Sequence, residues 1–256
     1  MAMPTPDSTG VPAGTQLRVH TGNLVITRPG TVIDGLDIRG YVDVRASGVI
    51  IRNSLIRGGA IGGQASLVQV ITPGASLTIQ DSELDPTHRH PKIDGLRGFN
   101  ITANRIEVRN VVDSGHFWAP GNVTIRDSLL HQNLHFENDP GWNGGPSHDD
   151  NIQIQSGSNY IIERNRFSGA YNAAIMITQD RGTTSNVRIY LNWIDGGACS
   201  VNIAQKGYGP FQNIDVLNNR FDTSRYTCWI LKPPAGDIQV SGNWSRLTPY
   251  QKVVTR

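Results

Sequence analysis

The densest run of titratable side chains in the sequence is His148-Asp149-Asp150, which directly precedes the alternating segment NIQIQ. Two adjacent carboxylates at the start of a strand can hold a cation, or act as an acid and a base where their environments differ. Neighbouring side chains of a strand point to opposite faces, so only one of Asp149 and Asp150 is expected to face a groove. These three residues are the predicted catalytic set, and an ordinary polar loop is the alternative.

A second group of polar side chains suits the hydroxyl groups of a sugar polymer. Residues 151–155, 174–179, 200–205 and 228–232 are expected to be strands, with mostly uncharged outward side chains on the first three. An amide both donates and accepts hydrogen bonds, and an exposed indole offers a flat surface to a sugar ring. The predicted substrate-binding residues are Gln153, Gln155, Trp142, Gln179, Asn202, Lys206 and Lys232. A solvated sheet face would carry the same pattern.

The alternation in these strands also predicts the side chains that fill the core. The expected inward pairs are Ile152 and Ile154, Ile175 and Ile177, Val201 and Ile203, and Trp229 and Leu231. In the last strand Ile230 and Lys232 would then face outward.

Six of the seven histidines fall between residues 88 and 148. His88 and His90 would share one face of a strand, and His131 and His135 are four residues apart. A zinc site usually needs three protein ligands at bonding distance, which this spacing does not establish. The sequence therefore predicts no metal and no cofactor, with a divalent cation such as calcium as the alternative. Calcium-dependent lysis would also need a Lys or Arg base, for which Arg181, Lys206 and Lys232 are the candidates.

An eight-residue pattern recurs along the chain and must position these groups. It reads apolar, any, apolar, any, any, Asn or Ser, any, apolar, at spacings of 28, 22, 24, 37, 27, 27 and 24 residues. The copies are VIIRNSLI from Val49, LTIQDSEL from Leu77, FNITANRI from Phe99, VTIRDSLL from Val123, YIIERNRF from Tyr160, VRIYLNWI from Val187, IDVLNNRF from Ile214 and IQVSGNWS from Ile238. A period of 20 to 50 residues is typical of a solenoid.

The period within each copy identifies the kind of solenoid. Apolar positions one and three alternate with polar ones, as in a strand, and no segment keeps the spacing of an amphipathic helix. The sixth column is expected to stack as a ladder along the axis and to tolerate a left-handed corner, although Asn and Ser could simply mark turns. Its members are Ser54, Ser82, Asn104, Ser128, Asn165, Asn192, Asn219 and Asn243. The two interruptions, residues 85–95 and 131–150, are expected to form the binding face.

This pattern resembles the right-handed parallel β-helix superfamily of pectate-lyase-like and phage tailspike-like proteins, over roughly residues 32–244. The resemblance implies an all-β, single-stranded right-handed parallel β-helix of about eight to ten coils. Residues 1–23 would form an N-terminal arm or cap and residues 24–256 the helix domain. His148-Asp149-Asp150 is similar to the paired aspartates of polygalacturonase-type hydrolases, but the Gly-His-Gly and Arg-x-Lys motifs of those enzymes are absent.

The composition of the chain limits the classes of molecule that it is expected to bind. A net charge of +2 without a concentrated basic face argues against nucleic-acid binding. The N-terminal residues form no apolar run, and no later segment is long enough for membrane insertion. Cys199 and Cys228 are about one coil apart, and either a disulfide or two buried thiols fits that spacing.

The tailspike-like scaffold, together with these features, favours a glycan-directed protein of a bacteriophage tail. It would be a minor tail or receptor-binding component, located in the virion, that binds cell-surface polysaccharide and contacts other phage tail proteins. The resemblance implies a homotrimer. The first alternative is a secreted polysaccharide hydrolase or lyase that uses His148, Asp149 and Asp150. The second alternative is a structural assembly protein.

Overall fold

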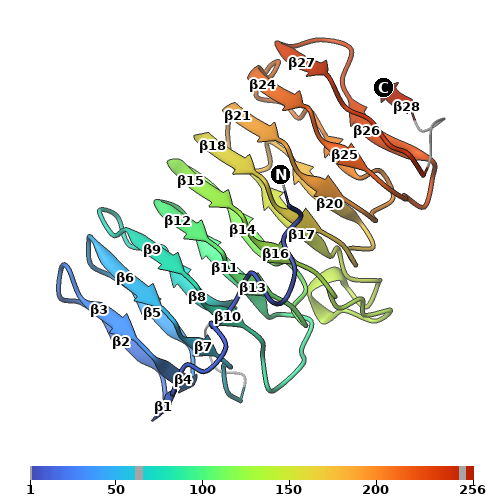
Figure 1. Cartoon of the computed structure of the whole chain (residues 1–256). Helices are drawn as coiled ribbons and strands as arrows, with labels where there is room; N and C mark the ends of the chain where they lie inside the picture. Colours follow the sequence, from blue (N-terminus) through green and yellow to red (C-terminus); the bar gives the residue numbers. More distant parts are fainter. Residues whose placement is uncertain (1, 61–65, 248–251) are drawn as a thin grey trace.

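The computed structural model describes residues 2–60, 66–247 and 252–256. Figure 1 shows strands that stack coil upon coil, with the chain progressing from one end of the stack to the other. In the described residues the only helix is the short η1, Pro140–Trp142, and none is long and apolar enough to cross a membrane. The chain is therefore an all-β solenoid.

The described strands form three parallel sheets, here called A, B and C, of nine, ten and nine strands. Sheet A contains β1 Arg18–Thr21, β4 Leu36–Arg39, β7 Leu55–Ile56, β10 Glu83–Leu84, β13 Glu107–Val108, β16 Leu129–Leu130, β19 Arg166–Phe167, β22 Trp193–Ile194 and β25 Arg220–Phe221. Sheet B contains β2 Leu24–Ile26, β5 Val42–Val44, β8 Ser66–Val70, β11 Asp94–Gly98, β14 Gly115–Phe117, β17 Asp150–Ile154, β20 Ala173–Ile177, β23 Val201–Ile203, β26 Cys228–Lys232 and β28 Lys252–Thr255. Sheet C contains β3 Val32–Asp34, β6 Val49–Arg52, β9 Leu77–Gln80, β12 Ile101–Asn104, β15 Gly121–Arg126, β18 Gly157–Glu163, β21 Thr184–Tyr190, β24 Gln212–Leu217 and β27 Ile238–Ser241. The predicted parallel β-helix is confirmed. Strand β1 falls within the predicted N-terminal arm and pairs with β4.

Each copy of the eight-residue pattern forms one corner of a coil. Its first residues make a strand of sheet C, and its last residue lies in a strand of sheet A, as for β18 and β19. The fifth residue is left-handed, with φ of 52° at Asp127, 55° at Arg164, 56° at Leu191 and 53° at Asn218. The left-handed corner therefore belongs to the fifth column, and not to the sixth as predicted.

The sixth column forms the predicted ladder. The side-chain oxygen of Asn192 accepts from the backbone N of Asn165 at 2.9 Å and from its Nδ2 at 3.1 Å, and Asn219 does the same for Asn192 at 3.0 and 2.9 Å. The three side chains are at most 1% exposed. Each buried amide thus satisfies backbone and side-chain groups of its neighbour where the chain turns and the sheet pattern is interrupted.

One predicted member of the ladder is wrong. Ile101, and not Phe99, pairs with Leu77 and Val123, so the true copy begins two residues later and its sixth residue is Ile106. The backbone N of Ile106 donates to Ser128 Oγ at 3.1 Å, as a ladder member does, but its own apolar side chain is buried in the core. Asn104 instead lies in β12 beside Gln80 and Arg126.

The core is a column of branched and aromatic side chains between the three sheets, and the inward positions predicted for β17, β20 and β23 are buried there. The prediction for β26 is partly wrong. Trp229 is buried and stacks on Phe221 at 5.3 Å between ring centroids, but Ile230 is also in the core and Leu231 is outside, next to Asn202. A shift in the pairing of β26 with β28 between Cys228 and Ile230 accompanies this break in the alternation. Cys199 and Cys228 form a disulfide, which settles the alternative left open by their spacing.

Candidate functional site

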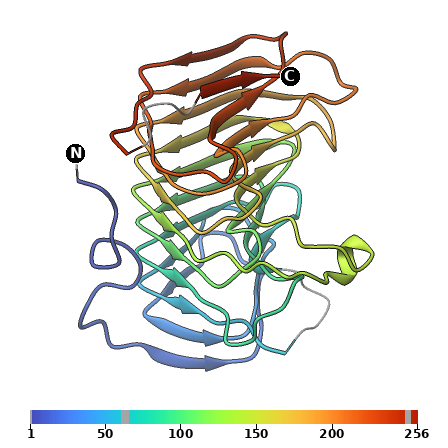
Figure 2. The same ribbon diagram turned by 90° about the vertical axis from the view of Figure 1, so that its right-hand side faces the viewer.

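A cavity of about 630 Å³ lies on the outer face of sheet B. Its floor comes from outward side chains of β11, β14, β17 and β20, and one wall is the segment that contains η1, which stands away from the coils in Figure 2. The lining residues include Lys92, Asp94, Arg97, Asp113, His116, Trp142, His148, Gln153, Gln155, Thr178, Asp180 and Lys206. Both interruptions of the repeat contribute to this cavity.

The sheet register brings three aspartates from successive coils into one row. Leu96, Gly115 and Ile152 are paired neighbours, so Asp94, Asp113 and Asp150, each two residues earlier, follow one another along the axis. The backbone connects them: the N of Asp113 donates to Asp94 Oδ1 at 3.4 Å, and the N of Asp150 donates to Asp113 Oδ1 at 2.9 Å. Parallel pairing thus concentrates carboxyl groups that are 19 and 37 residues apart.

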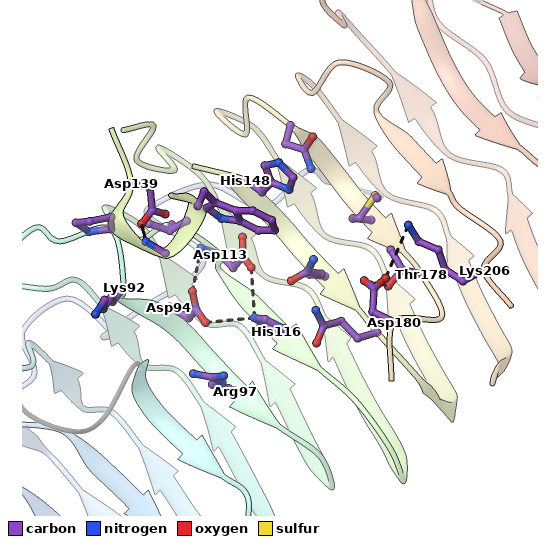
Figure 3. Close-up of a pocket in the computed structure, with 18 residues that line it drawn as sticks. Lys92, Asp94, Arg97, Asp113, His116, Asp139, His148, Thr178, Asp180 and Lys206 are labelled. Atoms are coloured by element: carbon purple, nitrogen blue, oxygen red, sulfur yellow. Dashed lines mark hydrogen bonds and ion pairs between the residues drawn. The ribbon is translucent and has the colours of Figure 1, made fainter. Parts of the chain in front are cut away.

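His116 completes this group from the neighbouring outward position. Its Nδ1 lies 3.4 Å from Asp94 Oδ2 and 3.4 Å from Asp113 Oδ2, as Figure 3 shows. Its Nε2 is buried and has no hydrogen-bond partner among the described residues. We call Asp94, Asp113, His116 and Asp150 the carboxyl cluster. Gly115, between Asp113 and His116 in the chain, leaves room for the Phe117 ring in the core, because a Cβ there would lie 2.7 Å from that ring.

Burial makes the cluster chemically unusual. It raises the pKa of Asp113 well above its ordinary value, and the nearby charges of Asp94 and Asp150 raise it further. Burial also raises the pKa of Asp150 to about 8, against the effect of hydrogen bonds from Asn172 Nδ2 and Ala173 N to its Oδ1. Carboxyl groups whose pKa is raised in this way can serve as proton donors.

The same cluster is the part of the described chain best suited to a cation. One ligand atom each from Asp94, Asp113 and His116 lies within 4.8 Å of the others. Two carboxylate oxygens and an imidazole nitrogen would suit a borderline transition metal better than calcium, which prefers oxygen ligands alone. His88 and His90 lie outside this cluster, and His131 Nε2 instead contacts Glu107 Oε1 at 2.9 Å.

The structure separates the three predicted catalytic residues. Asp149 points away from the carboxyl cluster and is buried, where its Oδ1 contacts His135 Nδ1 at 2.6 Å and its Oδ2 accepts from the N of Tyr171 at 2.7 Å. Asp150 joins the carboxyl cluster. His148 is exposed at the cavity and stacks on Trp142 with 3.9 Å between ring centroids.

The predicted binding residues also divide. Four of them line the cavity: Trp142, Gln153, Gln155 and Lys206. Gln179 is buried and occupied, since its Nε2 donates to the Gly209 carbonyl and its Oε1 accepts from the N of Lys206, both at 3.0 Å. Asn202 lines a separate hollow near the disulfide, and Lys232 donates to the Pro233 carbonyl at 3.4 Å.

Sequence reasoning missed Asp94, Asp113 and His116. The two aspartates share a signal with Asp150: each lies two residues before the first inward position of a sheet B strand, in the segments IDGL, VDSG and DDNI. That signal becomes readable only when the register is known, because one of the intervals contains the long segment with η1.

A comparison of the chain with protein families, with curated proteins and with solved structures finds no match in any of the three.

Proposed function

We propose that the protein binds a polysaccharide in the cavity on sheet B and cleaves a glycosidic bond there by general acid–base catalysis. The observation that carries this proposal is the carboxyl cluster: buried Asp94 and Asp113, with His116 between them, line a 630 Å³ cavity that Gln153 and Gln155 also line. Paired carboxyl groups with different environments are the usual acid and base of glycoside hydrolysis.

The roles follow from the environments. Asp113, whose pKa burial raises, is the candidate acid that donates a proton to the leaving oxygen as the C–O bond breaks. Asp94 is the candidate nucleophile, which attacks the sugar carbon as the C–O bond breaks; one of its oxygens lies within 4.8 Å of an Asp113 oxygen, close to the spacing of retaining glycosidases. Asp113 then takes a proton from the water that hydrolyses the bond between the sugar and Asp94, which restores both groups. His116 contacts both carboxyl groups and positions them. Asp150 is a positioning residue, because its backbone N fixes Asp113 Oδ1.

Recognition would use the remaining lining of the cavity. Gln153 and Gln155 offer donors and acceptors to sugar hydroxyls, and Trp142, 49% exposed, offers a ring face on the side not covered by His148. These groups bind a chain of sugars without requiring a particular charge.

The test is incubation with a panel of neutral and acidic polysaccharides, followed for new reducing ends and for the absorbance of unsaturated uronates. Reducing ends without that absorbance would indicate hydrolysis, and both signals together would indicate lysis. If no polysaccharide yields product while the folded protein binds one of them, the proposed cleavage is wrong.

Binding without cleavage is the second candidate, favoured by the exposed Trp142–His148 stack in the same cavity as the amides of Gln153 and Gln155. It would fit the tail-component hypothesis, in which the protein attaches a phage to cell-surface polysaccharide. Sedimentation of the purified protein tests the homotrimer expected under that hypothesis. Antibody labelling of phage particles tests the virion location.

A further inference from the structure

Two arginines from different coils converge on one indole beside the cavity. Trp118 follows β14, Arg97 lies in β11, and Arg181 follows β20. The guanidinium carbons of Arg97 and Arg181 lie 5.4 and 4.7 Å from the centroid of the Trp118 ring. We call these three residues the arginine–tryptophan cluster. These two cation–π contacts hold the guanidinium groups beside the ring.

The two guanidinium groups have no carboxylate of their own. Neither makes an ion pair with any described residue, whereas Arg109 contacts three carboxylates and Arg164 contacts two. The nearest candidate, Asp180, accepts from Thr178 Oγ1 at 2.7 Å and lies 3.9 Å from Lys206 Nζ. Burial lowers the pKa of Arg181, the charge of Arg97 lowers it further, and the charge of Asp180 acts in the opposite direction.

The side-chain oxygen of Gln155 is a hydrogen-bond acceptor beside the arginine–tryptophan cluster. Gln155 follows Ile154, the register partner of Phe117, and is therefore the neighbour of Trp118 on the next coil. Its Oε1 is buried and has no hydrogen-bond partner among the described residues, and the residue lines the cavity. A sugar hydroxyl donating to Gln155 would hold the sugar beside Trp118, with any acidic substituent near the guanidinium groups.

We propose that Arg97, Arg181 and Trp118 form a binding site for an oxyanion substituent, a carboxylate or a sulfate, of the polysaccharide. The proposal rests on the proposed function and specifies the class of glycan. A guanidinium fork pairs with the oxygens of either anion through two parallel hydrogen bonds, and an anion between the two arginines would remove their mutual repulsion.

The location also brings groups of opposite charge side by side at the edge of the cavity. The His116 and Trp118 rings are 5.8 Å apart, so the arginine–tryptophan cluster lies directly beside the carboxyl cluster. Arg97 is the register partner of His116 (Figure 3). The anionic sugar is therefore expected next to the glycosidic bond whose leaving oxygen Asp113 would protonate. There the two guanidinium groups would neutralise the charge of the sugar.

The test measures binding of dextran sulfate, polygalacturonate and neutral dextran to the full chain carrying Asp113→Asn, which prevents consumption of the ligand. Arg97→Gln and Arg181→Gln keep a planar group over Trp118. Each is expected to weaken binding of the preferred anionic polymer about 10-fold, with neutral dextran unchanged. The matched control is Arg188→Gln, which removes an arginine at the same 4.7 Å from a ring, that of Tyr190 on sheet C.

A loss confined to dextran sulfate assigns a sulfate, and a loss confined to polygalacturonate assigns a carboxylate. Equal effects of Arg97→Gln, Arg181→Gln and Arg188→Gln would overturn the site, because non-specific attraction alone would then explain binding. Cleavage is scored separately on the protein with Asp113 intact. Arginine-dependent binding without cleavage contradicts only the proposed function, and cleavage of neutral glycans that ignores both arginines contradicts only the anion site.

Discussion

Asp113 is the residue whose surroundings differ most from those of a surface aspartate. It is buried, it accepts from the backbone of the next coil, and it lies between two other carboxyl groups. Burial and these neighbouring charges raise the pKa of its carboxyl, which favours the protonated form that can deliver a proton to a bound substrate.

Asp113→Asn should therefore reduce the rate of glycan cleavage by about 100-fold or more, the usual contribution of a general acid. The amide keeps the oxygen that accepts from Asp150 N, so glycan binding should stay close to its original value and the melting temperature should not fall. Asp215→Asn, on sheet C, is the matched control and should keep full activity. Full activity in Asp113→Asn would exclude Asp113 as the acid.

Asp150 should make stability depend on pH. In an unfolded chain the pKa of an aspartate is about 3.9, whereas burial raises that of Asp150 to about 8. Between these values the folded protein binds the extra proton, so its stability falls as pH rises, by roughly 1 kcal/mol per pH unit for this one group. Asp94, Asp113, Asp149 and His116 surround it, and the raised pKa of Asp113 and Asp149 acts in the same direction.

Asp150→Asn removes this contribution while an oxygen remains to accept from Asn172 and Ala173. Melting temperature measured from about pH 5 to about pH 8 should fall less steeply in the variant than in the original protein. Parallel curves for the two proteins would show that Asp150 does not hold a proton in the folded state.

At the scale of the element, each coil depends on one left-handed residue and one ladder residue at the corner between sheets C and A. Asn192→Ala should lower the free energy of unfolding by about 2–3 kcal/mol, because the buried N and Nδ2 of Asn165 lose their acceptor. Urea denaturation measures this loss.

A second asparagine ladder supplies the control. It runs along the entry to sheet C, where Asn186 Nδ2 donates to Asn159 Oδ1 at 3.3 Å in an exposed position. Asn186→Gly preserves the left-handed φ of 52° and should cost less than about 1 kcal/mol. Equal losses in the two ladders would mean that burial is not the source of the stabilisation.

The repeat predicted the sheets, the ladder and most of the core, because each copy alternates apolar and polar residues with the two-residue period of a strand. The repeat did not determine at which residue every copy begins. Phe99, Ile101 and Ala103 alternate, so the apolar positions fit frames two residues apart, and the requirement for Asn or Ser at position six selected the wrong frame, with Asn104 in the ladder. For β26 the alternation itself failed, because a shift in pairing places both Trp229 and Ile230 in the core.

The carboxyl cluster could not be predicted from the spacing of residues in the sequence, for a related reason. Asp94 and Asp113 are 19 residues apart and Asp113 and Asp150 are 37 apart, and the difference is the segment with η1. His148-Asp149-Asp150 was visible because its groups are adjacent in sequence, yet Asp149 turns to His135 while Asp150 joins the cluster. The concentration of titratable residues in the sequence identified a coil that contributes to the cluster. The pairing register of sheet B determines which side chains of neighbouring coils lie together.

At the scale of the whole molecule, a coil contacts mainly its two neighbours, so stability is local along the axis. The end at β26 and β28 has few further coils to support it (Figure 1). The Cys199–Cys228 disulfide joins the β23 coil to the β26 coil, across a separation of 29 residues. Closing a loop of that size stabilises a fold by about 3.6 kcal/mol in the chain-entropy account.

In a solenoid that stabilisation should stay near the end where the cross-link lies. Replacing both cysteines by alanine should speed amide hydrogen exchange in β23, β26 and β28, and leave exchange in β8, β9 and β12 unchanged, because several coils intervene. Exchange monitored by mass spectrometry resolves the two regions. Faster exchange throughout the chain would instead show that all the coils unfold as one cooperative unit, and the carboxyl cluster would then depend on a bond several strands away.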